Sequence, residues 1–153
     1  MILFRTILFC TDFSPTADHA LQYALHMAQI HGARLILFHS VHQPLYPVLA
    51  EPFVMTQVVE QQEDRLRREA EEEIRRRYVP AMPASVSWEL AVRSGNPSQE
   101  ILRIIQEKGV DLVVMGARGR SPLELLMFGS VAHRVVKRSP VPVMTVSLRP
   151  SDS

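Results

Sequence analysis

The sequence predicts an α/β fold with a single domain: an open, doubly wound parallel sheet of five strands with helices on both faces. Short, continuous apolar runs alternate with amphipathic segments along the whole chain, and prolines and glycines separate them. Apolar runs without polar alternation are typical of parallel strands that helices cover on both faces. With right-handed crossovers, this order indicates a Rossmann-like sheet, for which we expect the strand order 3-2-1-4-5.

Five runs rich in apolar and β-branched residues are the predicted strands. They cover residues 2–10, 33–41, 85–92, 111–115 and 143–148. The last run, within PVPVMTV, is expected at an edge of the sheet. An exposed apolar edge strand can pair with a strand of another chain, so this end of the sequence is a candidate contact surface.

Four helices are predicted between the strands, at residues 15–31, 53–78, 97–108 and 130–138. The first has clear end signals, because Ser14 followed by Pro15 is typical of a helix start and Gly32 of a helix end. The third has the same signals. The second is highly charged and carries one narrow apolar stripe, formed by Leu66, Ala70, Ile74 and Tyr78.

Composition limits the classes of function. The chain has 153 residues, enough for one domain, which we place at residues 1–148 with a C-terminal tail at 149–153. A net charge of +1 gives no reason to expect nucleic acid or an anionic membrane as partner. Cys10 is the single cysteine, so an internal disulfide is impossible. No run reaches the roughly 20 apolar residues of a membrane helix, and no secretory leader is evident, so we expect a cytoplasmic protein.

The segment GARGRSPLELLMFGS, residues 116–130, is the main candidate for ligand binding. It follows the fourth strand and ends at the start of a helix, where unpaired backbone N–H groups can hold an anion. Glycine allows a phosphate to approach the backbone closely. The spacing matches neither a Walker A loop nor the dinucleotide-binding pattern. From these residues alone, the glycines could equally serve only to shape turns.

Other residues are expected at the same end of the sheet, since ligands of such folds bind outside the carboxyl ends of the strands. Thr11, Asp12 and Ser14 follow the first strand, and Val41 ends the second. Asp12 has a plainer interpretation as a helix cap or a partner of the helix dipole. His39 and His42 are poorly placed for joint metal binding, because positions three apart on a strand point to opposite faces. No metal site is predicted.

The glycine pattern G-x2-G-x9-G-S resembles the ATP-binding branch of the universal stress protein family. The block from Val113 to Val146 is similar to the C-terminal block of that family throughout, and Thr11 to Ala28 is similar to its first loop and helix. The resemblance covers the chain except residues 42–83. His133 departs from it, since an acidic residue is more usual there.

The resemblance implies a cofactor and a role for each matching residue. Asp12, next to Thr11, would hydrogen-bond the ribose hydroxyls of ATP, with or without Mg²⁺ on the nucleotide. The backbone of Val41 would read the adenine edge. The adenosine and the phosphates would contact a further set of residues: Met115, Gly116, Gly119, Gly129, Ser130 and Val131.

The resemblance also implies a homodimer through the last strand, around Val143–Leu148, and a role in stress response. No general base is evident near the phosphates, so no catalytic residue is assigned and slow ATP hydrolysis at most is expected. Two alternatives remain at this point: a nucleotide-free dimeric scaffold of the same fold that acts by protein contact, and an ATP hydrolase.

Overall fold

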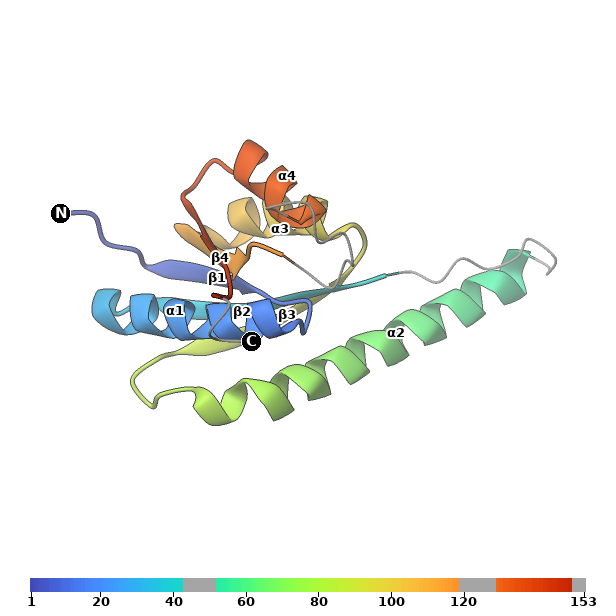
Figure 1. Cartoon of the computed structure of the whole chain (residues 1–153). Helices are drawn as coiled ribbons and strands as arrows, with labels where there is room; N and C mark the ends of the chain where they lie inside the picture. Colours follow the sequence, from blue (N-terminus) through green and yellow to red (C-terminus); the bar gives the residue numbers. More distant parts are fainter. Residues whose placement is uncertain (43–51, 119–128, 150–153) are drawn as a thin grey trace.

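The computed structural model describes residues 1–42, 52–118 and 129–149, which form a five-stranded sheet between two layers of helices (Figure 1). All strand pairs are parallel, and their order is β3-β2-β1-β4-β5. The predicted α/β fold and strand order are confirmed. In chain order the elements are β1 Thr6–Cys10, α1 Pro15–His31, β2 Arg34–Val41, α2 Pro52–Arg77, a 3-10 turn Val79–Ala81, β3 Trp88–Ser94, α3 Pro97–Lys108, β4 Leu112–Gly116, α4 Ser130–Arg138 and β5 Val143–Val146.

The strand order creates a switch point in the middle of the sheet. The chain passes from β1 to β2 on one side, whereas β4 lies on the other side of β1 and leads to β5. The connections after β1 and β4 therefore diverge at the carboxyl ends of these two strands. Open parallel sheets bind their ligands at such a point.

Two apolar clusters hold the helices to the two faces of the sheet. Ile7, Phe9 and Leu37 pack on one face with α1 and the C-terminal part of α2. Leu8 and Phe38 point to the opposite face, where α3 and α4 cover them. Successive strand residues alternate between the clusters, and both faces are buried, which explains why the strands are continuously apolar.

Every strand has bounds that differ from those predicted, by three or four residues at the start of the first and third strands and by at most two elsewhere. The apolar run at 2–10 forms a strand only from Thr6, and Ile2 and Leu3 are exposed. The third strand was expected at 85–92 but covers Trp88–Ser94, because Trp88 is the residue that pairs with Leu35 of β2. Apolar character predicts that a strand exists, whereas its ends depend on where a partner strand begins.

The predicted helix ends are confirmed where capping signals were clear. The Ser14 hydroxyl accepts a hydrogen bond from the Ala17 N–H at 3.2 Å, and Gly32 adopts the left-handed conformation at the end of α1. Asn96 and Gly109 play the same parts in α3. No helix in the described ranges is long and apolar enough to cross a membrane.

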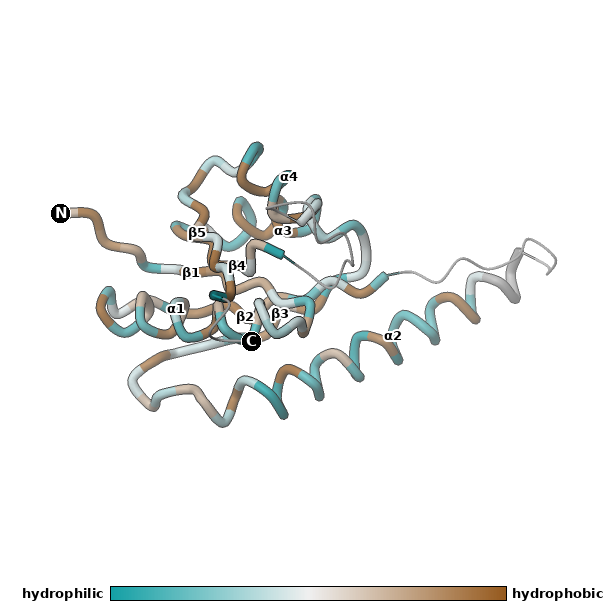
Figure 2. The backbone as a smooth tube through the Cα atoms, in the orientation of Figure 1, coloured by the Kyte–Doolittle hydropathy of each residue, from teal (hydrophilic) through white to brown (hydrophobic). Residues whose placement is uncertain are grey.

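The α2 helix has a buried half and a projecting half. Ala70, Ile74 and the following Tyr78 are buried in the core. The other end of α2 extends beyond the sheet (Figure 1), and hydrophilic residues dominate the helix along its length (Figure 2).

The β5 strand is an edge strand, as predicted. The Val113 N–H donates to the Pro142 carbonyl at 3.0 Å, and the Ala117 N–H donates to the Val146 carbonyl at 2.8 Å. Since backbone groups of a strand alternate in direction, Val143 and Thr145 point their N–H and C=O groups away from β4. These groups lie at the free edge of the sheet.

Candidate functional site

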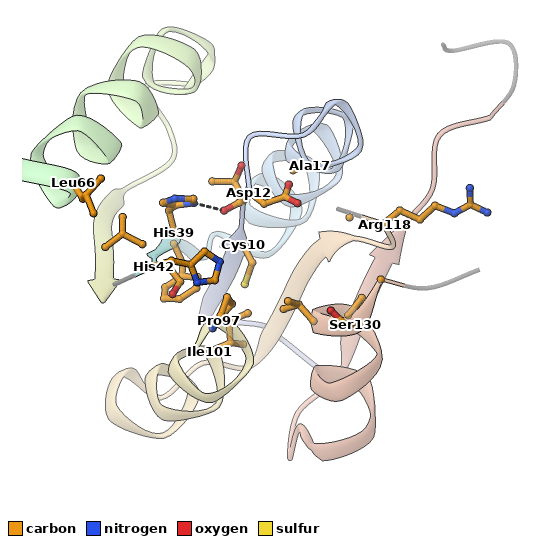
Figure 3. Close-up of a pocket in the computed structure, with 18 residues that line it drawn as sticks. Cys10, Asp12, Ala17, His39, His42, Leu66, Pro97, Ile101, Arg118 and Ser130 are labelled. Atoms are coloured by element: carbon orange, nitrogen blue, oxygen red, sulfur yellow. Dashed lines mark hydrogen bonds between the residues drawn. The ribbon is translucent and has the colours of Figure 1, made fainter. Parts of the chain in front are cut away.

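A cavity of about 560 Å³ opens at the carboxyl ends of β1, β2 and β4, at the switch point of the sheet (Figure 3). This volume lies within the range typical of small-molecule sites, roughly 300–1,000 Å³. Its lining combines strand ends with the first turns of α3 and α4 and one residue of α2: Cys10, Thr11, Asp12, Ala17, Phe38, His39, Ser40, Val41, His42, Leu66, Pro97, Ile101, Gly116, Arg118, Gly129, Ser130, Val131 and Ala132.

The cavity brings together most of the residues that the sequence singled out. Those that line it are Thr11, Asp12, Val41, Gly116, Gly129, Ser130 and Val131. Met115 is instead buried in the core, in the same cluster as Cys10 and Ala132, which do line the cavity. Gly119 lies outside the described residues.

The loop after β1 places Asp12 at the cavity by a set of local hydrogen bonds. The Asp12 carboxylate accepts from the Ser14 N–H at 3.0 Å, and the Thr11 hydroxyl accepts from the Phe13 N–H at 2.9 Å. Between them, Phe13 has a φ of 62°, a left-handed conformation that is uncommon for a residue with a side chain. The cap of α1 is Ser14, so the plainer interpretation of Asp12 as the helix cap does not describe its contact.

The end of β2 is fixed from two sides. The Val41 carbonyl accepts from the Gly95 N–H at 3.1 Å, and the Ser40 hydroxyl donates to the Gly95 carbonyl at 2.8 Å. His39 Nδ1 lies 2.7 Å from the Thr11 carbonyl. Because a carbonyl oxygen can only accept, Nδ1 carries the proton of this hydrogen bond. These contacts tie the ends of β1, β2 and β3 together at the cavity wall.

The N-terminus of α4 forms the opposite wall. Gly129 precedes the helix, and among the residues that the structure describes no side chain caps its first turn. The first intrahelical bond runs from the His133 N–H to the Gly129 carbonyl at 2.9 Å. The N–H groups of Ser130, Val131 and Ala132 precede this bond, so they have no partner within the helix and lie at its partial positive charge. All three residues line the cavity.

Gly129 does not need to be glycine for its backbone conformation. Its φ of −67° and ψ of 159° are open to any residue. Because glycine has no Cβ, only backbone atoms of residue 129 line the cavity at the helix start. The Gly129 N–H also donates to the Ala117 carbonyl at 2.7 Å, and this bond ties the start of α4 to the end of β4.

Gly116 has a different reason to be glycine. A Cβ at this position would lie 3.0 Å from Cγ2 of Thr16 and 3.2 Å from the backbone nitrogen of Ala17. The end of β4 therefore packs directly against the first turn of α1. This close contact brings both elements to the cavity, which Gly116 and Ala17 line.

Burial makes Cys10 a poor nucleophile. The thiol lies at the carboxyl end of β1, among the apolar side chains of the core. Burial raises the pKa of the Cys10 thiol far above its usual range, so the thiol stays protonated at neutral pH. Its sulfur contributes an apolar wall to the cavity.

Several lining residues were not singled out as site residues from the sequence. Leu66 was recognised only as part of the apolar stripe of α2, and Pro97 only as a helix start. Ile101 was assigned to the core face of α3, yet it also borders the cavity (Figure 3). The rule that first helical turns surround such sites would have indicated Pro97. Leu66 depends on how α2 crosses the sheet, and the stripe alone does not specify that.

Comparison with known proteins adds to this geometry. Residues 3–147 match the model of the universal stress protein family. A universal stress protein of Thermus aquaticus is 34% identical over 94% of this chain and 99% of its own. The universal stress protein YxiE of Bacillus subtilis is 32% identical, also over 94% and 99%.

Solved structures show the same arrangement. The protein MJ0577 of Methanocaldococcus jannaschii superimposes with a TM-score of 0.82 at 26% identity, covering 97% of this chain and 99% of the other. Two structures share the fold at lower identity: a universal stress protein in complex with cAMP (22%, TM-score 0.62) and one from Archaeoglobus fulgidus in complex with dAMP (18%, TM-score 0.54). The family match across nearly the whole sequence, together with the fold, shows that this chain belongs to the universal stress protein family.

Proposed function

We propose that the cavity binds ATP, alone or with Mg²⁺ on its phosphates, and that the chain acts as a homodimeric stress-response module. The observation that carries the proposal is the position of Asp12 at the same cavity as the N-terminus of α4. A carboxylate suits the hydroxyls of a ribose, and a helix start suits a phosphate.

The distribution of polar and apolar groups supports a nucleotide. Phe38, Val41, Leu66 and Ile101 give one part of the lining an apolar character that fits a base. On the α4 side, the backbone N–H groups of the first turn and the Ser130 hydroxyl can donate to phosphate oxygens. Arg118 is exposed beside this wall, and its side chain extends away from Ser130 in Figure 3. An extended arginine can turn toward a bound anion.

The nucleotide complexes of other family members support the same class of ligand. One of the compared proteins holds cAMP and another holds dAMP. Both ligands combine adenine, a ribose-type sugar and a phosphate. For this chain, we propose that residues lining the cavity contact the adenosine and the phosphates: Thr11, Asp12, Val41, Gly116, Gly129, Ser130 and Val131. Gly119 is proposed to contact the phosphates as well, whereas Met115, buried in the core, is not among the contacting residues.

Thermal unfolding with and without ATP tests the proposal. Ligand at about 100 times its Kd stabilises the folded state by about 2.7 kcal/mol, which raises Tm by about 5–10 °C for a domain of this size. Asp12→Ala and Gly129→Val are expected to lose this shift. Valine can adopt the φ and ψ of residue 129, so the second variant adds a side chain at the cavity wall without straining the backbone.

The control is Asp64→Ala, which removes an exposed carboxylate on α2 and should leave the shift unchanged. If millimolar ATP does not change the Tm of the wild type, the proposed ATP binding is wrong. Native mass spectrometry then separates it from a nucleotide-free scaffold, because a co-purified nucleotide adds its mass to the chain.

Rapid catalysis is not part of the proposal. The Asp12 carboxylate already accepts a hydrogen bond from Ser14, and its proposed partner is the ribose. We expect ATP turnover with Mg²⁺ below about one per minute, far under the median of about 10 per second for enzymes. Faster product formation would favour the hydrolase alternative.

A further inference from the structure

We propose that Tyr78 and Arg77, at the C-terminal end of α2, are positioning residues for the Asp12 loop. Through them, occupancy of the cavity is coupled to the stability of the end of α2. The inference rests on the proposed nucleotide binding, which it extends to a helix that contacts the loop across 67 positions of sequence.

The hydroxyl of Tyr78 joins α1, α2 and the loop in one directed chain of hydrogen bonds. Tyr78 is 2% exposed, and its hydroxyl donates to the Asp18 carboxylate at 2.7 Å. A phenol has one proton, so Tyr78 must accept from the Thr11 hydroxyl, which lies 2.6 Å away. The Thr11 oxygen remains the acceptor for the Phe13 N–H. The Thr11 hydroxyl therefore donates to the Tyr78 hydroxyl, and the Tyr78 hydroxyl donates to the Asp18 carboxylate.

Arg77 holds the same loop from its other side. Its Nη1 donates to the Phe13 carbonyl at 3.0 Å, and its guanidinium lies 5.5 Å from the centre of the Phe13 ring. The guanidinium also pairs with Asp18 at 3.1 Å, so it is held in place independently of the loop. Arg77 is therefore a fixed support and not a loose surface contact.

These contacts stabilise a backbone conformation that Phe13 would not adopt alone. The left-handed conformation is unfavourable for a residue with a side chain, and it persists only when its surroundings hold it. The Phe13 ring packs 4.4 Å from the His39 ring and 6.2 Å from the Tyr78 ring, measured between centroids. Both backbone polar groups and the ring of Phe13 are thus fixed through residues 77 and 78.

Asp12 depends on this conformation because it is the next residue along the chain. The turn at Phe13 brings the Ser14 N–H to the Asp12 carboxylate and keeps that carboxylate at the cavity. If the loop relaxed, Asp12 would have to be ordered again when a ligand binds. That ordering cost would appear as weaker binding.

The same face of α2 meets the cavity at a second point. Leu66 lines the cavity, and Ala70, Ile74 and Tyr78 follow it at intervals of four, so one helical stripe leads from the cavity wall to the Asp12 loop. A ligand in the cavity that contacts both Leu66 and Asp12 binds better when α2 is packed against the sheet. By reciprocity, the ligand must then stabilise the docked helix.

Tyr78→Phe tests the inference, because it keeps the ring and removes only the hydroxyl. The variant loses both hydrogen bonds of the hydroxyl, and loss of the one from Thr11, which supports the loop, is expected to weaken ATP binding about three- to tenfold in isothermal titration. In the ligand-free variant, the amide of Phe13 should exchange with deuterium faster than in the wild type. Tyr23→Phe is the matched control, since Tyr23 is a half-exposed tyrosine on α1, and it should change neither quantity.

A second measurement on the wild type keeps the test decisive if Tyr78→Phe does not fold. Saturating ATP should slow amide exchange at Phe13 and at Tyr78 together, because the Tyr78 N–H is bonded to the Ile74 carbonyl at the end of α2.

Two outcomes would overturn the positioning role and leave nucleotide binding intact. In the first, Tyr78→Phe lowers Tm but binds ATP as the wild type does. In the second, ATP protects the amide of Phe13 and not that of Tyr78. A wild type that binds no ATP overturns the proposed function, whereas the ligand-free exchange at Phe13 still reports whether Tyr78 holds the loop.

Discussion

At the scale of single residues, the strand that precedes the Asp12 loop ends in Cys10, the only cysteine of the chain, and buries its thiol. Cys10 is 6% exposed, and burial raises its pKa because the thiolate would lose its hydration. The unfolded chain exposes the same thiol with an ordinary pKa of about 8.5. The two states therefore hold the Cys10 proton differently in alkaline solution.

The difference predicts a loss of stability at high pH. Above about pH 8.5 the unfolded chain releases the thiol proton and the folded chain keeps it, so rising pH favours unfolding by up to about 1.4 kcal/mol per pH unit. Urea unfolding between pH 7 and pH 10 measures this slope. Cys10→Ala should be less stable at pH 7, because it leaves a small cavity, yet flatter above pH 8.5. Parallel pH profiles for the two proteins would contradict the assignment.

Residue chemistry was predictable from the sequence where a local pattern encodes it. Ser14, Gly32 and Asn96 act as the caps that their neighbours indicated. The conformation of Phe13 was not predictable, because phenylalanine has no preference for positive φ and the contacts that hold it come from Arg77 and Tyr78. Strain imposed by distant packing leaves no local signature.

At the scale of elements, Gly116 sets how closely β4 and α1 approach. Gly116→Ala would place a methyl group 3.0 Å from Thr16 and 3.2 Å from the Ala17 nitrogen. Forcing the two elements apart is expected to cost about 1–3 kcal/mol of stability. The free energy of unfolding in urea measures the cost.

The matched control for Gly116→Ala is Gly32→Asn. Gly32 has open space around it, and asparagine tolerates the left-handed conformation that the end of α1 requires. This variant should stay close to the wild type. Equal stability of Gly116→Ala and the wild type would show that β4 and α1 can separate without cost.

Elements were predicted well in kind and less well in extent. The regular alternation of apolar runs and capped helices identified every helix and strand that the structure describes. The run at 2–10 was too long because Ile2 and Leu3 are apolar but do not pair with another strand. Three of the four residues in the apolar stripe predicted for α2 are buried, as expected. That the fourth, Leu66, lines the cavity could not be predicted, because it depends on how α2 packs against the rest of the fold.

At the scale of the whole molecule, the free edge of β5 is the surface through which we propose that two copies join. Thr145 directs its backbone N–H away from β4, so Thr145→Pro removes an edge donor without breaking a bond inside the sheet. We expect this variant to have the monomer mass in native mass spectrometry, where the wild type has twice that mass. Thr145→Val keeps the N–H and should remain a dimer.

ATP binding provides a separate readout for the same variant. The cavity lies at the carboxyl ends of β1, β2 and β4, and β5 does not line it. Thr145→Pro should therefore keep the thermal shift with ATP while it loses its partner. A wild type that is monomeric at every concentration would refute the proposed dimer and leave the proposed ligand untouched.

The hydrogen bond between the Gly129 N–H and the Ala117 carbonyl joins the start of α4 to the end of β4, and so holds together the two ends of the connection between these residues. Because the bond fixes both ends, the cost of closing that connection grows only slowly, by about 0.6 kcal/mol for each doubling of its length. A longer connection would therefore cost the fold little, because the hydrogen bond still holds the end of β4 beside the start of α4. Next to Ala117, however, Arg118 lines the cavity, so an insertion placed after Arg118 would add a recognition segment while this part of the cavity wall stays in place.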